Sequence, residues 1–224
     1  MISVIIPTLN EEKALPETLD HLFAQKGDFE VILVDGGSTD KTLNIAAADK
    51  RISLIHSDSG RARQMNAGAA KAQGEWLLFL HADTHLPANA INKINNIEDS
   101  SPILAGGFRH KFSGNNRGLK LVSWLHNFRC NITRVFYGDQ ALFVKRHLFA
   151  YIDGFPDEPV LEDVLFGEIL LKYTTPVIIP DHVITDSRKF EQSGILLSMF
   201  RVIAILVCHE LGLSVPRKFF AAIR

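Results

Sequence analysis

The chain has 224 residues, of which 46% are apolar and 22% charged, a composition typical of a soluble globular protein with a sizeable core. The formal net charge of -1 gives no electrostatic attraction to nucleic acid, so we expect no nucleic-acid partner. The two cysteines, Cys130 and Cys208, form no disulfide or metal-binding motif, and a reducing, cytoplasmic location is expected.

Strands and helices alternate in the prediction for the first part of the chain. Short apolar, β-branched runs are typical of strands buried on both faces, and they lie at 3–7, 30–34, 52–56 and 75–80. Helical spacing of apolar residues predicts helices between them, at 11–25, 41–50 and 61–72. This alternation with short connections predicts an α/β fold, with a mostly parallel central sheet flanked by helices.

Two residues are expected to mark the first strand–helix junction. Pro7 should end the strand because proline has no N–H for the ladder. Asn10 should cap the helix that follows, because asparagine is favoured at that position.

The pattern changes after residue 100. Strands are predicted at 106–109, 137–144 and 176–180, and helices at 117–131 and 162–172. A flexible loop is expected at 187–190. No linker divides the chain, so we expect one domain over 1–193, with a donor-binding half of about 1–100 and an acceptor-binding half of about 101–193.

The segment 194–224 is expected to be an apolar, helical C-terminal appendage. Its helix, at 194–213, is apolar nearly all round, but the longest uninterrupted apolar run is 202–208. That run is far shorter than the roughly 18–20 residues of a membrane-spanning helix. Gly212 and Pro216 are expected to stop the helix. We expect a buried or homodimer contact through 194–213, with a peripheral membrane contact as the alternative.

Polar residues gather where three predicted strands end. In an open parallel sheet, ligands bind at the carboxyl ends of the strands. The first strand ends near Thr8 and Glu11, the second at Asp35, and the fourth at His81 and Asp83. Asp35 followed by glycine is also common turn chemistry. Three such clusters at one sheet edge nevertheless predict a binding site.

Several of these segments resemble family 2 glycosyltransferases. The likeness is carried by SVIIPTLNEE at 3–12, VILVDGGSTDKT at 31–42, GRARQMNAG at 60–68, FLHADT at 79–84 and LED at 161–163. It covers about three quarters of the chain in the right order. The resemblance implies a GT-A fold and an inverting transfer of a sugar from a nucleotide diphosphate donor, most simply UDP-linked, to an acceptor hydroxyl.

The resemblance also implies a donor site. Asp35 would accept a hydrogen bond from the nucleobase, most simply uracil N3–H, and Gly68 would allow close helix packing. The donor-binding residues that it implies are Pro7, Thr8, Asn10, Glu11, Asp35, Gly36, Arg61, Asn66, His81, Ala82 and Asp83.

The family places a divalent metal on the donor diphosphate. Asp83 would be a ligand, and hard oxygen ligands suit Mg²⁺ or Mn²⁺. The family's usual Asp-x-Asp is replaced here by His81-Ala82-Asp83. His81 is therefore a second metal ligand, a donor contact or a structural histidine.

An acidic pair, Glu162-Asp163, would supply the catalytic base, because an acceptor hydroxyl is a poor nucleophile until a carboxylate takes its proton. Asp163 is preferred and Glu162 is the alternative. A purely structural reading is an acidic helix N-terminus that stabilises the helix dipole. Acceptor-binding residues are expected at Asp139, Gln140 and Arg188, the last by pairing with phosphate.

Two other functions compete with this one. A nucleotidyltransferase also binds a nucleotide on an α/β sheet, but it would carry a basic, glycine-rich loop after the first strand, where this chain has the acidic 8–12. A catalytically inactive nucleotide-sugar-binding protein is the second alternative. A dinucleotide oxidoreductase is disfavoured because no GxGxxG follows the first strand.

Overall fold

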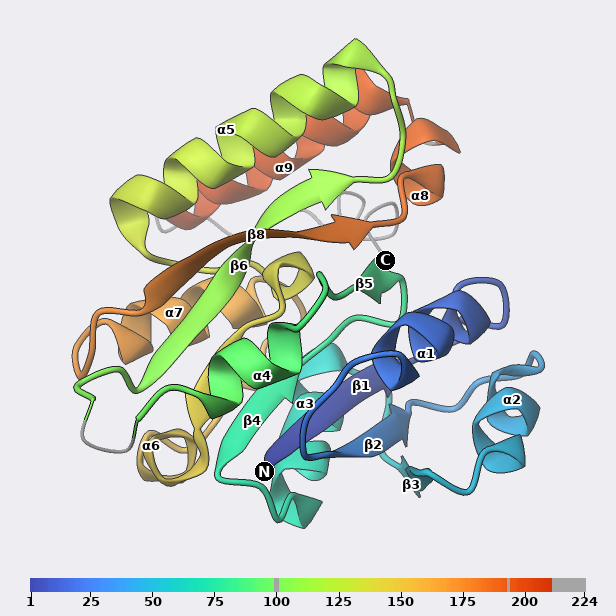
Figure 1. Cartoon of the computed structure of the whole chain (residues 1–224). Coiled ribbons are helices and arrows are strands. Elements are labelled where there is room, and N and C mark those ends of the chain that lie inside the picture. The colour runs from blue at the N-terminus through green and yellow to red at the C-terminus, as the bar shows by residue number, and fades with distance from the viewer. Residues whose placement is uncertain (99–100, 193, 211–224) are drawn as a thin grey trace.

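The computed structural model describes residues 1–98, 101–192 and 194–210. Their strands form one mixed sheet in the order β3-β2-β1-β4-β7-β6-β8-β5 (Figure 1). The strands are β1 (Ile2–Thr8), β2 (Phe29–Asp35), β3 (Ile52–His56), β4 (Trp76–Phe79), β5 (Thr84–His85), β6 (Ala105–Phe112), β7 (Phe143–Lys145) and β8 (Val177–Thr185). The helices are α1 (Leu15–Phe23), α2 (Thr42–Ala48), α3 (Arg61–Lys71), α4 (Ala90–Asn95), α5 (Arg117–Thr133), α6 (Arg146–Tyr151), α7 (Glu162–Leu170), α8 (Arg188–Gln192) and α9 (Ile195–Glu210), with a 3₁₀ turn, η1 (Gly138–Gln140).

The α/β prediction is confirmed, including a sheet that is mostly parallel. β1 pairs in parallel with β2 and β4, β2 with β3, and β6 with β8. Antiparallel pairs join β4 to β7, β6 to β7 and β5 to β8. The antiparallel β7 therefore connects β1 to β4 with β6 and β8 in one continuous sheet.

Helices cover both faces of the sheet, and alternate strand residues point into two hydrophobic cores. On one face, Val4 packs with residues of α1, α2 and α4, while Ile5 on the other face packs with residues of α3, α6 and α7. Gly68 lets α3 lie close to β1, since a Cβ at Gly68 would come within 2.5 Å of Ile5 Cγ2. The close packing expected at this glycine is confirmed.

The first strand–helix junction differs from the prediction. β1 runs through Pro7, which aligns with Val34, and ends at Thr8. α1 begins only at Leu15, and Asn10 is not its cap: it has a φ of 57°, and its side chain accepts a hydrogen bond from Thr39 N–H. The residues between β1 and α1 form a loop that is tied to the β2–α2 loop, which sequence periodicity does not report.

The second half also departs from the prediction in three places. The strand expected at 137–144 is instead η1 followed by the short β7. β8 continues past Pro180 because a register shift opposite Phe108 and Arg109 absorbs the proline, which has no N–H to donate. The loop expected at 187–190 contains the start of α8.

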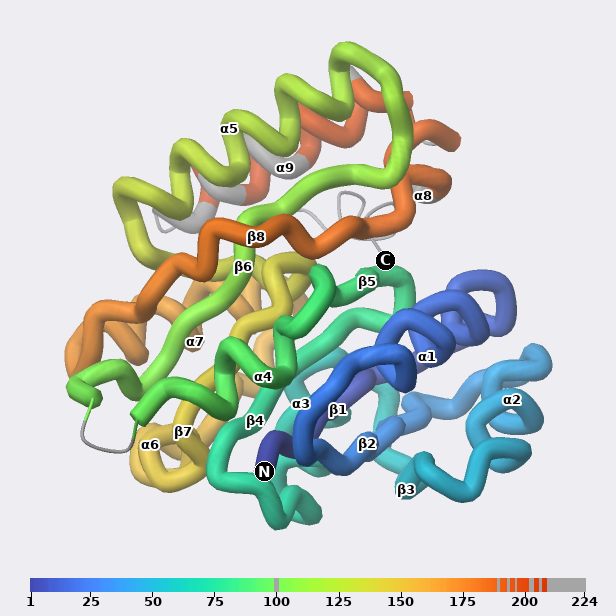
Figure 2. Tube along the Cα trace, viewed as in Figure 1, coloured from blue at the N-terminus to red at the C-terminus, as the bar shows by residue number. Residues whose placement is uncertain are grey.

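The C-terminal helix is present as α9, which packs beside α5 (Figure 2). The predicted stop residues Gly212 and Pro216, and the last part of the expected 194–213 helix, lie outside the described residues. Among the helices that the structure describes, none is both long and apolar enough to traverse a bilayer.

Candidate active site

A cavity of about 390 Å³ lies at the carboxyl ends of β1 and β4, between the starts of α3 and α7, and is closed on another side by η1 and the end of β8. The predicted site residues that line it are Pro7, Thr8, Glu11, Arg61, His81, Asp83, Asp139, Glu162 and Asp163. The predicted site residues that do not line it are Asn10, Asp35, Gly36, Asn66, Ala82, Gln140 and Arg188.

Asp163 is held in place at the start of α7 by two backbone donors. Gly138 N–H donates to Asp163 Oδ2 at 2.6 Å, and Val164 N–H donates to Oδ1 at 2.8 Å. Burial and the neighbouring Glu162 charge raise the pKa of Asp163 to about 6. A carboxylate with this pKa, facing a cavity, can accept a proton near neutral pH.

Glu162 has a different environment, although it is the next residue. It is buried, and its Oε1 pairs with Arg61 Nη1 at 3.3 Å. Arg61 thus joins α3 to α7 across the cavity. The two neighbouring carboxylates are distinguished by their partners: Glu162 has a guanidinium, and Asp163 has backbone N–H groups.

Asp83 lies beside a carboxylate that the sequence prediction missed. Asp186 N–H donates to the backbone oxygen of Asp83 at 2.9 Å, and both residues line the cavity. Hydrogen bonds from Arg188 outweigh the effect of burial and hold the pKa of Asp186 below its usual value. Asp186 directly follows β8, which extends to Thr185, whereas the predicted strand stopped at 180; a strand of the full length would have brought Asp186 under the rule that sites form at strand ends.

The residues at this point suit a hard divalent cation. Asp83 and Asp186 offer carboxylate oxygens on neighbouring backbone segments, which is the ligand type that Mg²⁺ and Mn²⁺ prefer. His81 lies on the same side of the cavity, next to Gly138, where a Cβ would collide with its imidazole. Glycine at position 138 therefore allows His81 and η1 to approach each other.

Asp35 lies next to the cavity but in the interior of the protein. Its Oδ2 accepts hydrogen bonds from the N–H groups of Gly37 and Ser38, at 2.8 and 2.9 Å, so it does form the turn. Its Oδ1 is buried and has no hydrogen-bond partner among the described residues. The end of β2 therefore contains a buried acceptor that is unsatisfied among the described residues.

Gln64 is a structural residue that sequence reasoning missed. Its Nε2 donates to Thr8 O and to Val34 O, each at 2.8 Å, and so ties together the ends of β1 and β2. Gly36 is packed against it, since a Cβ there would come within 2.9 Å of Gln64 Cδ. Only its place within the 60–68 motif pointed to a role.

Asn66 lies away from the cavity lining. Its amide donates to Phe155 O at 2.8 Å and accepts from Phe155 N–H at 2.9 Å. It thereby fixes the loop that contains Gly154, whose φ is +69°. Donor binding, the role expected of Asn66, remains a prediction.

The expected acceptor residues have three different environments. Asp139 lines the cavity. Gln140 is fully buried and bonds to Tyr137 N–H and Phe108 O. Arg188 pairs with Asp186, so it is one residue removed from the cavity wall.

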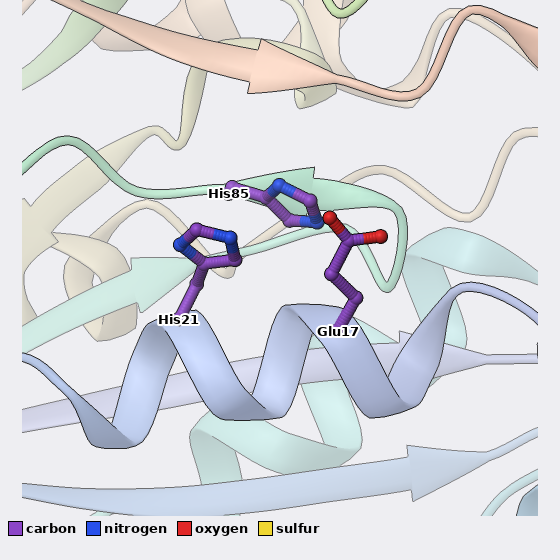
Figure 3. A group of neighbouring side chains, drawn as sticks. All are labelled: Glu17, His21 and His85. Atoms are coloured by element: carbon purple, nitrogen blue, oxygen red, sulfur yellow. The ribbon is translucent and has the colours of Figure 1, made fainter.

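Two groups of histidine and carboxylate side chains lie outside the Asp83 region. His110, His126 and Asp139 gather beneath the cavity, and Glu17, His21 and His85 gather on the surface between α1 and β5 (Figure 3). The sequence analysis did not single out either group, because each joins segments that are distant in sequence.

Comparison with known proteins identifies the family and the fold of this chain. Residues 3–155 match the family described as Glycosyl transferase family 2, and the chain belongs to this family, with its GT-A fold. The PGL/p-HBAD biosynthesis glycosyltransferase of Mycobacterium tuberculosis is 48% identical over 93 residues, covering 38% of this chain and 36% of that protein. The poly(ribitol-phosphate) β-N-acetylglucosaminyltransferase TarS of Staphylococcus aureus is 37% identical over 93 residues, covering 38% of this chain and 16% of that protein.

Solved structures agree with the family. The S. aureus TarS 1-349 complex with UDP-GlcNAc matches with a TM-score of 0.68 and 25% identity, over 84% of this chain and 58% of that one. The mannosyltransferase PcManGT of Pyrobaculum calidifontis, solved with GDP-Man and Mn²⁺, matches with a TM-score of 0.63 and 22% identity, over 99% of this chain and 68% of that one, which shows the fold alone. The chain spans only about a third of the length of the mycobacterial relative that it matches.

Proposed function

We propose that the chain transfers a sugar from a UDP-linked donor to an acceptor hydroxyl, with inversion at the anomeric carbon. The observation that carries this proposal is the convergence of Asp83, Glu162, Asp163 and Asp186 on one cavity, from segments far apart in the sequence. Family membership supports a glycosyltransferase over the nucleotidyltransferase alternative.

Uridine is the proposed base for two reasons. The TarS structure that this fold matches contains UDP-GlcNAc. The unpartnered Asp35 Oδ1 is a hydrogen-bond acceptor, which complements the N3–H of uracil. Guanine also presents N–H donors, and PcManGT was solved with GDP-Man, so GDP-mannose is the comparison donor in the test below.

Asp83, Asp186 and His81 are the residues that would hold a divalent cation, Mg²⁺ or Mn²⁺, on the donor diphosphate. When bound, such a cation neutralises the negative charge that develops on the departing diphosphate. Glu11 and Thr8 line the wall of the cavity at the end of β1, where donor contacts are expected.

Asp163 is the proposed base. The acceptor oxygen forms a bond to the anomeric carbon from the face opposite the diphosphate, the bond from that carbon to the diphosphate oxygen breaks, and the hydroxyl proton passes to an Asp163 oxygen. The N–H groups of Gly138 and Val164 fix the orientation of the carboxylate. Arg61 pairs with Glu162, which leaves Asp163 as the carboxylate without a guanidinium partner.

The acceptor is proposed to enter from the side of Asp139, in the half of the chain after residue 100. We also propose that the catalytic domain ends at residue 193 and that the protein is cytoplasmic. Both described cysteines, Cys130 and Cys208, are free thiols, in keeping with a reducing compartment.

Isothermal titration calorimetry with UDP, UDP-GlcNAc and GDP-mannose, each with and without Mn²⁺, tests the donor. We expect UDP and UDP-GlcNAc to bind and Mn²⁺ to tighten both. If no uridine compound binds at millimolar concentration, the donor assignment is wrong. Released UDP supports glycosyl transfer, whereas released pyrophosphate would identify a nucleotidyltransferase, and donor binding without turnover would identify an inactive binding protein.

A further inference from the structure

Three side chains from three elements meet beneath the active-site cavity. His110 comes from β6, His126 from α5 and Asp139 from η1, and their ligand atoms lie within 4.8 Å of one another. His110 Nε2 lies 3.4 Å from Asp139 Oδ2, and His126 Nε2 lies 3.6 Å from Asp139 Oδ1.

These separations are long for hydrogen bonds between nitrogen and oxygen. The two Nε2 atoms and Asp139 Oδ1 are buried and have no hydrogen-bond partner among the described residues. Burial lowers the pKa of His110, and lowers that of His126 to about 3, so both imidazoles are neutral and each can offer a lone pair. Buried polar atoms without a hydrogen-bond partner require an explanation, and an ion bound between them is one.

The geometry points to a divalent transition metal of the Zn²⁺ class, held by His110, His126 and Asp139. Two ligands at about 2.0–2.1 Å from one tetrahedral ion are about 3.3 Å apart, close to the two separations found here. Two imidazoles and one carboxylate favour Zn²⁺ over Mg²⁺, and because the two nitrogens approach different oxygens of Asp139, the three side chains can supply all four donor atoms of a four-coordinate ion. This set shares no residue with the Asp83 group.

One nearby charge opposes the ion. The Arg129 guanidinium stacks on the Tyr137 ring, 3.6 Å from its centroid, and its charge is felt at His126. The affinity is therefore expected to be lower than in a site without a neighbouring cation. Asp139 nevertheless supplies a partly buried negative charge, which two neutral imidazoles do not compensate.

Binding would also anchor η1. Asp139 adjoins Gly138, whose N–H bonds to Asp163. A metal that joins η1 to β6 and α5 would restrict the backbone donor that orients this carboxylate. The ion is thus inferred to be structural, and its presence should raise the melting temperature of the protein.

The second group provides a matched control. Glu17 and His21 are exposed on α1, and His85 is stacked on His21 with ring centroids 4.3 Å apart (Figure 3). It contains the same ligand types, but on the surface. Replacing His21 tests whether Zn²⁺ binds at this surface group.

The test uses the full chain after treatment with a chelator, titrated with ZnCl₂ by calorimetry. We expect one tight Zn²⁺ per chain, weakened at least about 100-fold in His126→Ala and in Asp139→Asn, more than is typical for losing an outer-shell partner. His21→Ala should leave this event unchanged. The visible absorption of bound Co²⁺ should be lost in His126→Ala and in Asp139→Asn, but kept in His21→Ala. The site is overturned if the wild type does not bind Zn²⁺. It is also overturned if a correctly folded His126→Ala binds Zn²⁺ fully, or if Zn²⁺ binding is lost in His21→Ala instead.

A separate observation concerns the outer face of α5. Its exposed apolar residues follow helical spacing, and they are Leu121, Trp124, Leu125, Phe128 and Ile132. Trp124 is 58% exposed and Ile132 is 68% exposed, and Trp124 stacks on Phe128 with centroids 5.4 Å apart. Large apolar side chains aligned in this way mark an interaction surface.

α9 lies beside α5 (Figures 1 and 2). Leu197, Phe200 and Val207 of α9 are also exposed. We call these three residues and the five of α5 the α5–α9 face.

The charge around the α5–α9 face is positive. α5 contains Arg117 and Lys120 at its start and no acidic residue, Arg134 follows it, and α9 contains Arg201 and one acidic residue, Glu210. A second copy of the chain would bring the same charge to the contact, whereas an anionic surface would be attracted.

We propose that the α5–α9 face docks on an anionic lipid bilayer surface. A basic helix that exposes Trp, Phe and Leu is typical of proteins that lie in the interfacial layer. Ser198 and Ile205 of α9 also line the active-site cavity. Docking would therefore bring the cavity to the lipid surface. This inference rests on the proposed function, because it supplies the cavity with a lipid-linked acceptor hydroxyl.

Sedimentation with vesicles tests docking. We expect binding to vesicles of phosphatidylcholine with phosphatidylserine, weaker binding to phosphatidylcholine alone, and weakening by salt. The double variant Trp124→Ala, Phe128→Ala should bind at least about tenfold more weakly. The control is Tyr151→Ala, Tyr173→Ala, another exposed aromatic pair with centroids 5.5 Å apart, which should bind as the wild type does.

Ultracentrifugation and calorimetry separate the alternatives. If the wild type does not bind vesicles but dimerises through Trp124, docking is overturned in favour of a homodimer. Equal loss of vesicle binding in the tyrosine control would also overturn docking, because binding would then not depend on the α5–α9 face. UDP binding should be the same in all variants. Failure of vesicle binding with intact UDP binding therefore contradicts docking alone and leaves the proposed donor site in place.

Discussion

The backbone N–H of Gly138 donates to Asp163 Oδ2 at 2.6 Å, which links a 3₁₀ turn to the first residues of α7. The same glycine packs against the imidazole of His81. One backbone position thus touches both the proposed base and the histidine that replaces the first acidic residue of the family's usual motif. The two contacts explain why glycine is needed at position 138, since a Cβ there would collide with His81.

Replacing the proposed base should remove turnover but spare donor binding. Asp163→Asn keeps the size of the side chain and an acceptor oxygen, but it cannot take a proton. We expect kcat to fall by about 10²–10⁴ and the Kd for UDP to change less than about twofold. The control is Glu168→Gln, an exposed carboxylate on the same helix, which should leave kcat unchanged. Normal turnover in Asp163→Asn would refute the role.

The rate should depend on pH through the same residue. The base acts when ionised, and the pKa of Asp163 is raised to about 6 by burial and by Glu162. We expect kcat/KM to rise with pH and to reach half its plateau near pH 6, with a tenfold fall per unit well below that. The check is a series of initial rates measured from about pH 4.5 to about pH 8, a range that extends to both sides of the pKa of Asp163. A profile that is flat through pH 6 would contradict the assignment.

Stability should move in the opposite direction. The pKa of Asp163 is about 6 when folded and 3.8 in the reference state, so between these values the folded protein holds a proton that the unfolded chain has lost. The free energy of unfolding contributed by Asp163 therefore falls as pH rises from about 4 to about 6. Asp163→Asn should be more stable than the wild type at pH 7 by about 1–2 kcal/mol, and nearly equal at pH 4. Urea unfolding at both pH values measures this, and a variant less stable at pH 7 would speak against the raised pKa.

Gln64 should matter for the integrity of the donor side. Gln64→Leu conserves volume but removes the two hydrogen bonds that join Thr8 O and Val34 O. We expect a loss of about 1–3 kcal/mol of stability and a higher Kd for UDP. Gln73→Leu, at an exposed position just after the same helix, is the comparison variant and should change neither quantity. Unaltered stability in Gln64→Leu would mean that the strand ends hold each other without it.

Local sequence determined most of the elements in the first 80 residues. Strands buried on both faces appear as continuous β-branched runs, so β1 to β4 were predicted to within a few residues. The rule that ligands bind at strand ends also indicated Thr8 and Asp83, which do line one cavity. These features depend on neighbours in sequence, where the pattern of side chains is informative.

Tertiary contacts decided the rest. Asn10 was expected to cap a helix, but its side chain bonds to Thr39 in another loop. The segment at 137–144 has strand-like composition, yet its backbone bends into η1, where Gly138 bonds to Asp163. No periodicity reports a contact between segments that are 25 or more residues apart.

The sequence by itself determined the family, the α/β class and the strands that place the polar loops, because burial on both faces of a parallel sheet leaves a direct record in composition. Only the tertiary structure decided which polar residues share a cavity, which are held by partners, and where His110, His126 and Asp139 meet. The physical reason is that hydrogen bonds and charges act over a few ångströms in space, whatever the distance along the chain.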